Sequence, residues 1–304
     1  MCRMGDVLAG NHAVWEFDAD SDSVLIRFAR GIRTPRLWHA LGERRIPLEA
    51  LSGVTVGTVA AGVGRREAVV LRAVPRPGAD PLMEAAAGQL KESCDPYRLV
   101  VPADRADQAA AFAQALRERL GPDGVHGVDG VHGVDGGGAA PAERFLVAVP
   151  QPPLTLKAYD ARVAFDGSAL TFHWSRTGAS SAKWRAGDQR FALAALAGVE
   201  WVSPDRPGGG HLRLLPRDPA EGPAATPDHD LAAAVFGVGY GAVHESLPFA
   251  AAVLAALRER TPVGSVPRAR VSGERLRHLS ELHSTGLLTD AEYETLRARF
   301  TAGA

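Results

Sequence analysis

A glycine-rich tract near the middle of the chain carries the side chains whose spacing most obviously suggests chemistry. Within residues 121–141 (GPDGVHGVDGVHGVDGGGAAP), acidic and imidazole side chains alternate at every third position: Asp123, His126, Asp129, His132 and Asp135. Such side chains are common metal ligands, so one interpretation is a metal-binding tract. The tract is also a short glycine-rich iteration, and a flexible segment loses much conformational entropy when it organises ligands. We therefore interpret residues 121–143 as a flexible linker and predict no metal site.

A second candidate is the glycine-rich segment GVGYG at 237–241. A dinucleotide-binding fingerprint needs a strand before it and a helix opening within it, inside a βαβ unit. We expect another strand after this segment, so a mobile loop between strands is the favoured interpretation. The ten histidines are scattered, and neither an HExxH nor a GxSxG motif occurs. The sequence therefore predicts no catalytic residue and no bound cofactor.

Positive charge is concentrated in the first third of the chain, where ten arginines and only three glutamates lie between residues 27 and 76. Such a cluster favours an anionic partner: a lipid headgroup, a phosphate or an acidic protein. The alternative is that strand alternation merely places arginine on every solvent-facing position. The residues of this candidate anionic-ligand face are Arg27, Arg30, Arg33, Arg36, Arg44, Arg45, Arg65 and Arg66.

The elements that would position these residues occur twice. RIPLEALSGV at 45–54 recurs as RFALAALAGV at 190–199, and Trp38 matches Trp184, which we expect to be a core or corner position. Apolar residues that alternate along the chain also correspond, namely Val24, Ile26 and Phe28 in the first copy and Leu170, Phe172 and Trp174 in the second. Alternation of this kind predicts the buried face of a strand. The chain is thus a duplication in which interior packing is the shared constraint.

Each copy is rich in strands first and helical last. In the first copy the predicted strands are 12–18, 23–29, 43–48, 51–58, 68–74 and 97–101. A helix over 104–120 follows, with Asp104 as its N-cap. Its apolar stripe is Ala109, Phe112, Ala113, Leu116 and Leu120, and the matching stripe in the second copy is Ala250, Val253, Leu254 and Leu257. This order predicts an α+β protein with two tandem pleckstrin-homology-like β-sandwich or open-barrel domains, each closed by a C-terminal helix.

The end of the chain predicts a helical hairpin. Gly286 would end its first helix, and Thr289 with Glu292 would form a capping box for the second. The apolar face of the hairpin comprises Leu276, Leu279, Leu282, Leu287, Leu288, Tyr293, Leu296 and Phe300. A 27-residue segment without cysteine rarely folds alone, so this face needs a second copy of itself, one of the larger domains or another protein. We favour self-association. The predicted organisation is a first repeat at 8–120, a linker at 121–143, a second repeat at 144–260, a linker at 261–273 and the hairpin at 274–300.

Two parts of the chain resemble known families. LSELHSTGLLTDAEYETLRARF resembles the SHOCT domain, a short two-helix module found at the C-terminus of bacterial proteins. GNHAVWEFD, RIPLEALSGV and ADPLMEAAAG resemble an actinobacterial domain-of-unknown-function family, number 4429. The first resemblance implies oligomerisation or an interaction role. The second implies pleckstrin-homology-like domains, usually in tandem, with no established activity and no catalytic residues to transfer.

Composition places the chain among globular proteins, with 46% hydrophobic and 23% charged residues and a net charge of −1. We expect no transmembrane segment and no secretory leader, and two cysteines favour a reduced, cytoplasmic compartment. The sequence therefore predicts a non-enzymatic cytoplasmic binding or scaffold protein that self-associates or recruits a protein partner through 274–300, with no specific nucleic-acid partner. The alternative is peripheral binding of anionic lipid or phosphate by the arginine-rich face. A third hypothesis is an enzyme whose groups meet only in space.

Overall fold

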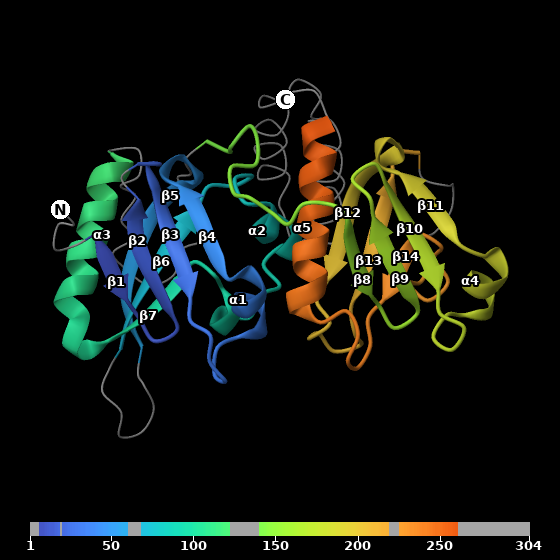
Figure 1. Cartoon of the computed structure of the whole chain (residues 1–304), viewed down its shortest axis with the longest axis horizontal. Coiled ribbons are helices and arrows are strands. Elements are labelled where there is room, and N and C mark those ends of the chain that lie inside the picture. Colours follow the sequence, from blue (N-terminus) through green and yellow to red (C-terminus); the bar gives the residue numbers. More distant parts are fainter. Residues whose placement is uncertain (1–5, 19, 60–67, 122–139, 219–224, 261–304) are drawn as a thin grey trace, which may run out of the picture. The chain divides into compact units, whose positions relative to one another are not determined.

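The computed structural model describes residues 6–18, 20–59, 68–121, 140–218 and 225–260 (Figure 1). All of them belong to one compact unit that ends at Arg260. Several sequence predictions lie outside the described residues: the His/Asp tract at 123–135, Arg65 and Arg66, the linker at 261–273 and the whole hairpin at 274–300.

The first repeat contains two antiparallel sheets. Four strands follow one another in the first sheet: β1 (Val7–Ala9), β2 (Ala13–Asp18), β3 (Ser23–Phe28) and β4 (Glu43–Pro47). Three form the second: β5 (Leu51–Val59), β6 (Ala68–Pro75) and β7 (Arg98–Pro102). The helices are α1 (Arg36–Leu41) between β3 and β4, α2 (Pro81–Ala86) between β6 and β7, and α3 (Ala106–Leu120) after β7.

Apolar alternation positions these strands as predicted. Trp15 on β2 is the register partner of Ile26 on β3, and both are buried. Phe112 of α3 stacks on Phe17 with ring centroids 4.4 Å apart, so the predicted helical stripe does face the core. The predicted N-cap was wrong: a 3-10 turn at Ala103–Arg105 follows β7, and Arg105 rather than Asp104 precedes the helix.

The second repeat has the same order of strands, but among its described residues it has no helix that corresponds to α2. Its four-stranded sheet contains β8 (Leu154–Lys157), β9 (Ala161–Phe165), β10 (Ala169–Trp174) and β11 (Gln189–Ala192). Its three-stranded sheet contains β12 (Leu196–Val202), β13 (His211–Pro216) and β14 (Ala233–Val235). The helices are α4 (Ser181–Ala186) between β10 and β11, and α5 (Val243–Arg260) after β14. In each repeat the sheets remain separate, and the described strands form no closed barrel.

The duplicated segment RIPLEALSGV has a structural explanation. In both copies one strand ends in a single 3-10 turn, Leu48–Ala50 or Leu193–Ala195, from which the next strand starts. The strand then shifts register between its leucine and its glycine, at Leu51 and Gly53 in one copy and at Leu196 and Gly198 in the other. Such a bulge bends the chain where it passes from the first sheet into the second. The two copies keep a similar sequence here because both must form this bend.

Helix α5 differs from α3 in its surroundings. It packs against β12 and β8 of its own repeat and against α1 and α2 of the first repeat. Ala250, Val253 and Leu257 are buried as predicted, and so are Phe249 and Ala252 on other sides of the helix. A helix with apolar residues all round is expected where it is enclosed by two partners. Among the described residues, no helix is both long and apolar enough to span a bilayer.

Candidate functional site

The predicted arginine-rich face is divided by the structure. Arg27 on β3 forms ion pairs with Glu16 and with its register partner Glu43; the side chains of Arg27 and Glu43 are about half exposed, and that of Glu16 is partly buried. Arg45 on β4 pairs with Asp18. Each of these arginines thus faces a carboxylate across the sheet, as cross-strand pairs of opposite charge do. They form a neutralised sheet surface and not part of a positive face.

Arg44 was wrongly placed on that face, because its guanidinium is buried. It donates two hydrogen bonds to Asp80, at 3.0 and 2.9 Å, and the Tyr97 hydroxyl donates a third at 2.8 Å. Asp80 also caps α2 by accepting from the Leu82 amide. Burial is the main cause that raises the pKa of Tyr97 well above its ordinary value, and the Asp80 carboxylate adds to it. Arg44 points inward because it lies two residues before Ile46 on β4, and alternate residues of a strand face the same side of the sheet.

The three remaining described arginines of the set lie together around the β3–α1 loop, residues 29–35, which Figure 1 shows below β3. Arg30, Arg33 and Arg36 are exposed and have no ion-pair partner among the described residues. Ile32 lies between them with its side chain fully exposed (106%). The Thr34 amide donates to the Gly31 carbonyl at 3.1 Å, which turns the loop tightly. This loop therefore presents an aliphatic tip surrounded by unpaired positive charge.

The matched tryptophans do not share an environment. Trp38 is buried, stacks on Phe28 and donates to the Cys94 carbonyl at 3.0 Å. Trp184 is 51% exposed, so its predicted core position was wrong. In α4 the preceding residue, Lys183, occupies the interior instead.

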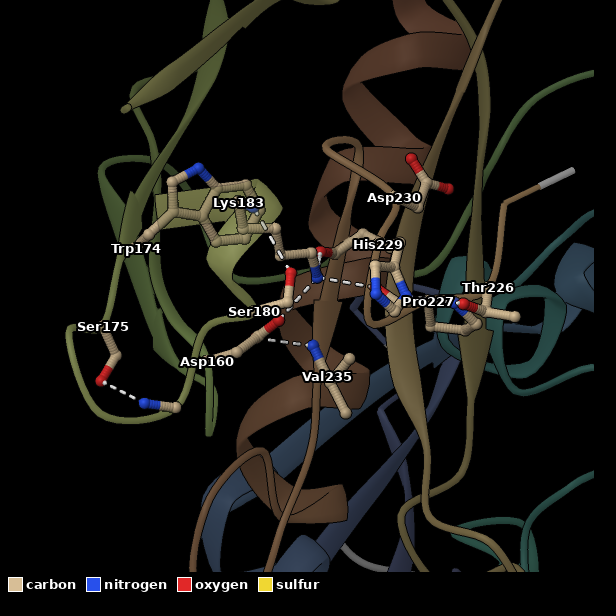
Figure 2. A network of polar contacts seen from close by, with 12 residues as sticks. Asp160, Trp174, Ser175, Ser180, Lys183, Thr226, Pro227, His229, Asp230 and Val235 are labelled. Atoms are coloured by element: carbon tan, nitrogen blue, oxygen red, sulfur yellow. Dashed lines mark hydrogen bonds and ion pairs between the residues drawn. The ribbon is translucent and has the colours of Figure 1, made fainter. Parts of the chain in front are cut away.

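The Lys183 ammonium is completely buried and fully hydrogen-bonded. It donates to Asp160 Oδ2 at 2.6 Å, to the Pro227 carbonyl at 2.6 Å and to the Ala233 carbonyl at 2.8 Å (Figure 2). Asp160 Oδ1 accepts from the Val235 amide at 2.8 Å. The network joins α4 to the β8–β9 turn, to the segment that precedes β14 and to β14 itself. Sequence reasoning missed it, because its members come from four separate segments.

Around this network three loops converge on Tyr159. The Tyr159 amide donates to the Val235 carbonyl at 2.9 Å, and Gly241 donates to the Lys157 carbonyl at 3.0 Å. Gly178 and Gly237 both approach Tyr159 closely: a Cβ at 178 would overlap the Tyr159 carbonyl, and one at 237 would make a tight contact of 3.0 Å with the Tyr159 side chain. The β8–β9, β10–α4 and β14–α5 loops are thus held in one arrangement.

These loops enclose an open groove of about 360 Å³. Its lining residues are Lys157, Ala158, Tyr159, Ala161, Arg162, His173, Trp174, Ser175, Thr177 and Tyr240. The lining contains two cations, an imidazole, two aliphatic hydroxyls and two phenolic hydroxyls but no carboxylate. The Lys157 ammonium lies 4.9 Å from the Tyr240 ring, and Tyr240 meets Tyr159 edge to face. We call this the second-repeat groove.

The segment GVGYG contributes one residue, Tyr240, to the lining of this groove. It is a turn closed by a bridge between Gly237 and Tyr240, and the Val238 side chain is fully exposed. The expectation that a strand follows was wrong, because α5 begins at Val243. The preceding strand, β14, belongs to an antiparallel sheet, so the segment is not the opening of a βαβ unit.

A second cavity, of about 410 Å³, is lined by β4 and by residues 147–150, with His244 and Pro248. Its charged residues already have partners, since Arg44 pairs with Asp80 and Arg45 with Asp18. Glu43 also contributes a carboxylate. This cavity therefore lacks the unopposed positive charge of the second-repeat groove.

The fold and these surfaces define a tandem-repeat α+β protein with antiparallel sheets. The sequence model of one family, described as a domain of unknown function (DUF4429), matches residues 15–117 and 163–254, one segment in each repeat. The chain belongs to this family. No curated protein and no solved structure matches it.

Proposed function

We propose that this protein is a non-enzymatic, cytoplasmic binding protein that attaches to anionic membrane surfaces through its β3–α1 loop. The observation that supports the proposal is the fully exposed Ile32 between Arg30 and Arg33, neither of which has an ion-pair partner among the described residues. A basic residue near an anionic leaflet contributes about 1 kcal/mol, and an inserted aliphatic side chain adds apolar burial. Strand alternation does not account for Arg30 and Arg33, because they lie within the loop itself.

We further propose that each repeat is a pleckstrin-homology-like domain of an actinobacterial protein. The order of a four-stranded sheet, a three-stranded sheet and a final helix in both repeats supports this assignment. In such an arrangement loops at the end of a sandwich, rather than sheet faces, are the natural contact surface.

Sedimentation with lipid vesicles tests the membrane proposal. The vesicles are phosphatidylcholine with and without phosphatidylserine at about one lipid in three, a fraction that gives an appreciable surface potential. We expect wild-type protein to bind only the anionic vesicles and the double variant R30E/R33E to lose binding. The variant I32S should bind more weakly even where salt already screens the charges. The matched control is R144E/R206E, which makes the same change in net charge at two exposed arginines elsewhere. Equal loss in the control, or no binding by wild type, would contradict the proposal.

A second proposed function is self-association or recruitment of a protein partner through residues 274–300, as a SHOCT-type hairpin. It is supported by the sequence alone: the capping box of Thr289 and Glu292, and an apolar face that a 27-residue segment has no core to bury. Light scattering of the full chain and of a chain lacking 274–304 tests it. We expect the full chain to be larger than a monomer and the shortened chain to be a monomer. A monomer in both cases would remove self-association, and a pull-down with a 274–300 peptide that retains no protein would remove recruitment.

A further inference from the structure

We infer that the second-repeat groove is a phosphate-binding site, distinct from the β3–α1 loop and independent of the membrane proposal made for it. Lys157 and Arg162 would hold the phosphate oxygens, Ser175 and Thr177 would donate hydroxyl hydrogen bonds, and Tyr159 and Tyr240 would contact the rest of the ligand. The ligand class is a phosphate group, carried either by a lipid headgroup or by a free phosphorylated molecule.

The charge of the groove is the first support. Arg162 is exposed and has no ion-pair partner among the described residues, and Lys157 has only the face of Tyr240. The carboxylate beneath the groove, Asp160, is turned inward and used by Lys183 and the Val235 amide. Asp188 is not a lining residue, and its carboxylate lies 2.7 Å from the ring of His173. The two cations therefore face the groove without an internal counter-charge, which favours an anion.

The second support is that the groove is already formed. Its loops are fastened by the backbone hydrogen bonds at Lys157 and Tyr159 and by that of the Ser175 amide to the Asp160 carbonyl at 2.8 Å. Gly178 and Gly237 fit against Tyr159, and the buried Lys183 network lies beneath. A preformed site loses little conformational entropy on binding. Its volume is also within the usual range for small-ligand sites.

The third support comes from the first repeat. Aligned through the strand pairs Leu8–Trp15 and Leu156–Val163, Lys157 corresponds to Ala9, Arg162 to Val14 and Tyr159 to Asn11. The fold therefore does not need either cation at these positions, since the first repeat forms the same strands with apolar residues. Two cations that converge on one groove in only one copy indicate a ligand and not a packing requirement.

The residues at the rim of the groove indicate which kinds of molecule could carry the phosphate. Tyr159 is 49% exposed with its ring edge-to-face against Tyr240, and the fully exposed Val238 stands on the glycine turn beside them. Aromatic rings of this kind suit both a membrane interface and a planar group on a soluble ligand. The two sources share the phosphate chemistry and are separated by experiment.

The test uses the full chain and the variant K157A/R162V, which introduces the residues of the first repeat. Inorganic phosphate is titrated while the amide resonances of residues 175–178 are followed by NMR, and binding to phosphatidylcholine vesicles with and without phosphatidic acid is measured in parallel. We expect saturable shifts in the wild type and a loss of affinity of about tenfold or more in the variant, since each charge-assisted hydrogen bond contributes roughly 1.5–3 kcal/mol. R144A/R206A should bind as the wild type does. The variant R30E/R33E should keep its response to inorganic phosphate even if it loses vesicle binding, which separates this inference from the proposed function.

Each outcome decides one point. Saturable phosphate shifts, together with vesicle binding that does not depend on Lys157 and Arg162, would identify a free phosphorylated molecule as the source. Vesicle binding that requires Lys157 and Arg162 would identify a lipid headgroup. Identical phosphate affinities of wild type and K157A/R162V, or no response to either probe, would overturn the inference. If that variant failed to fold by circular dichroism, K157Q/R162Q, which keeps an uncharged polar side chain at both positions, would serve with the same expected loss.

Discussion

Lys183 lies in the second repeat where Leu37 lies in the first, and the side chains of both are buried. Each residue directly precedes the tryptophan of its helix. Leu37 fastens α1 by joining the apolar core, whereas Lys183 fastens α4 by three hydrogen bonds to Asp160 and two carbonyls. A buried ammonium is costly unless all its donors and its charge are satisfied, as they are here. The second repeat thus replaces an apolar contact by a polar one that also holds the loops around Tyr159.

Removing this ammonium should be strongly destabilising. K183M leaves the Asp160 carboxylate buried without its counter-charge, so we expect the free energy of unfolding to fall by about 3–5 kcal/mol. The double variant K183M/D160N should lose less, because no charge remains and the asparagine Oδ1 still accepts from Val235. Urea unfolding measures both. R185M, on the exposed side of the same helix, is the matched control and should stay within about 0.5 kcal/mol of wild type. Equal losses in the single and double variants would show that charge burial is not the cause.

Arg44 and Arg45 form a natural matched pair, because adjacent strand residues point to opposite faces. R44L leaves Asp80 buried with only Tyr97 and the Leu82 amide, and we expect it to cost about 3–5 kcal/mol. R45L removes an exposed ion pair with Asp18 and should cost at most about 1 kcal/mol. Denaturant unfolding of the two variants checks the difference. Similar costs would mean that Arg44 is not enclosed.

The raised pKa of Tyr97 predicts how stability responds to alkaline pH. Burial and the Asp80 carboxylate keep this hydroxyl protonated in the folded protein, whereas the unfolded chain releases the proton near its ordinary value of about 10. The unfolded state then binds fewer protons, so the contribution is fully present below pH about 10 and declines as pH rises above it. Unfolding at several pH values between 9 and 11 should show this decline in wild type and a shallower one in Y97F. Superimposable pH profiles would refute the assignment.

Much of the fold was predictable because strands and helices leave periodic patterns. The alternation of Trp15 and Phe17 located β2, and the stripe through Phe112 located the core face of α3. The repeat of RIPLEALSGV indicated two copies, and the family match in both halves confirms the repeated arrangement. Arg44 lies two residues before Ile46 on the same strand, so alternation alone would have placed both on the buried face. Counting charges did not use this information.

The groove was not predictable in the same way. Tyr159, Ser175 and Tyr240 come from three irregular connections, and what brings them together is a hydrogen-bond network that includes Lys183 and Asp160. No periodicity marks a loop, and a lysine beside a tryptophan in a short helix gives no sign that it is buried. The comparison of the two copies also gave one wrong prediction. Because Trp38 and Trp184 correspond in sequence, both were expected to be buried, but Trp184 is half exposed.

The two tryptophans therefore give a direct test of where the repeats diverge. W38A removes a buried ring that stacks on Phe28, and we expect it to cost about 3–5 kcal/mol of unfolding free energy. W184A removes a half-exposed ring and should cost about 0.5 kcal/mol or less. The other four tryptophans of the chain are buried, so acrylamide should quench chiefly Trp184 in the native protein, and W184F should remove most of that quenching. W38F serves as the control, with quenching like that of wild type. Equal costs for the two alanine variants, or unchanged quenching in W184F, would mean that α4 buries its tryptophan as α1 does and that Lys183 does not occupy the interior.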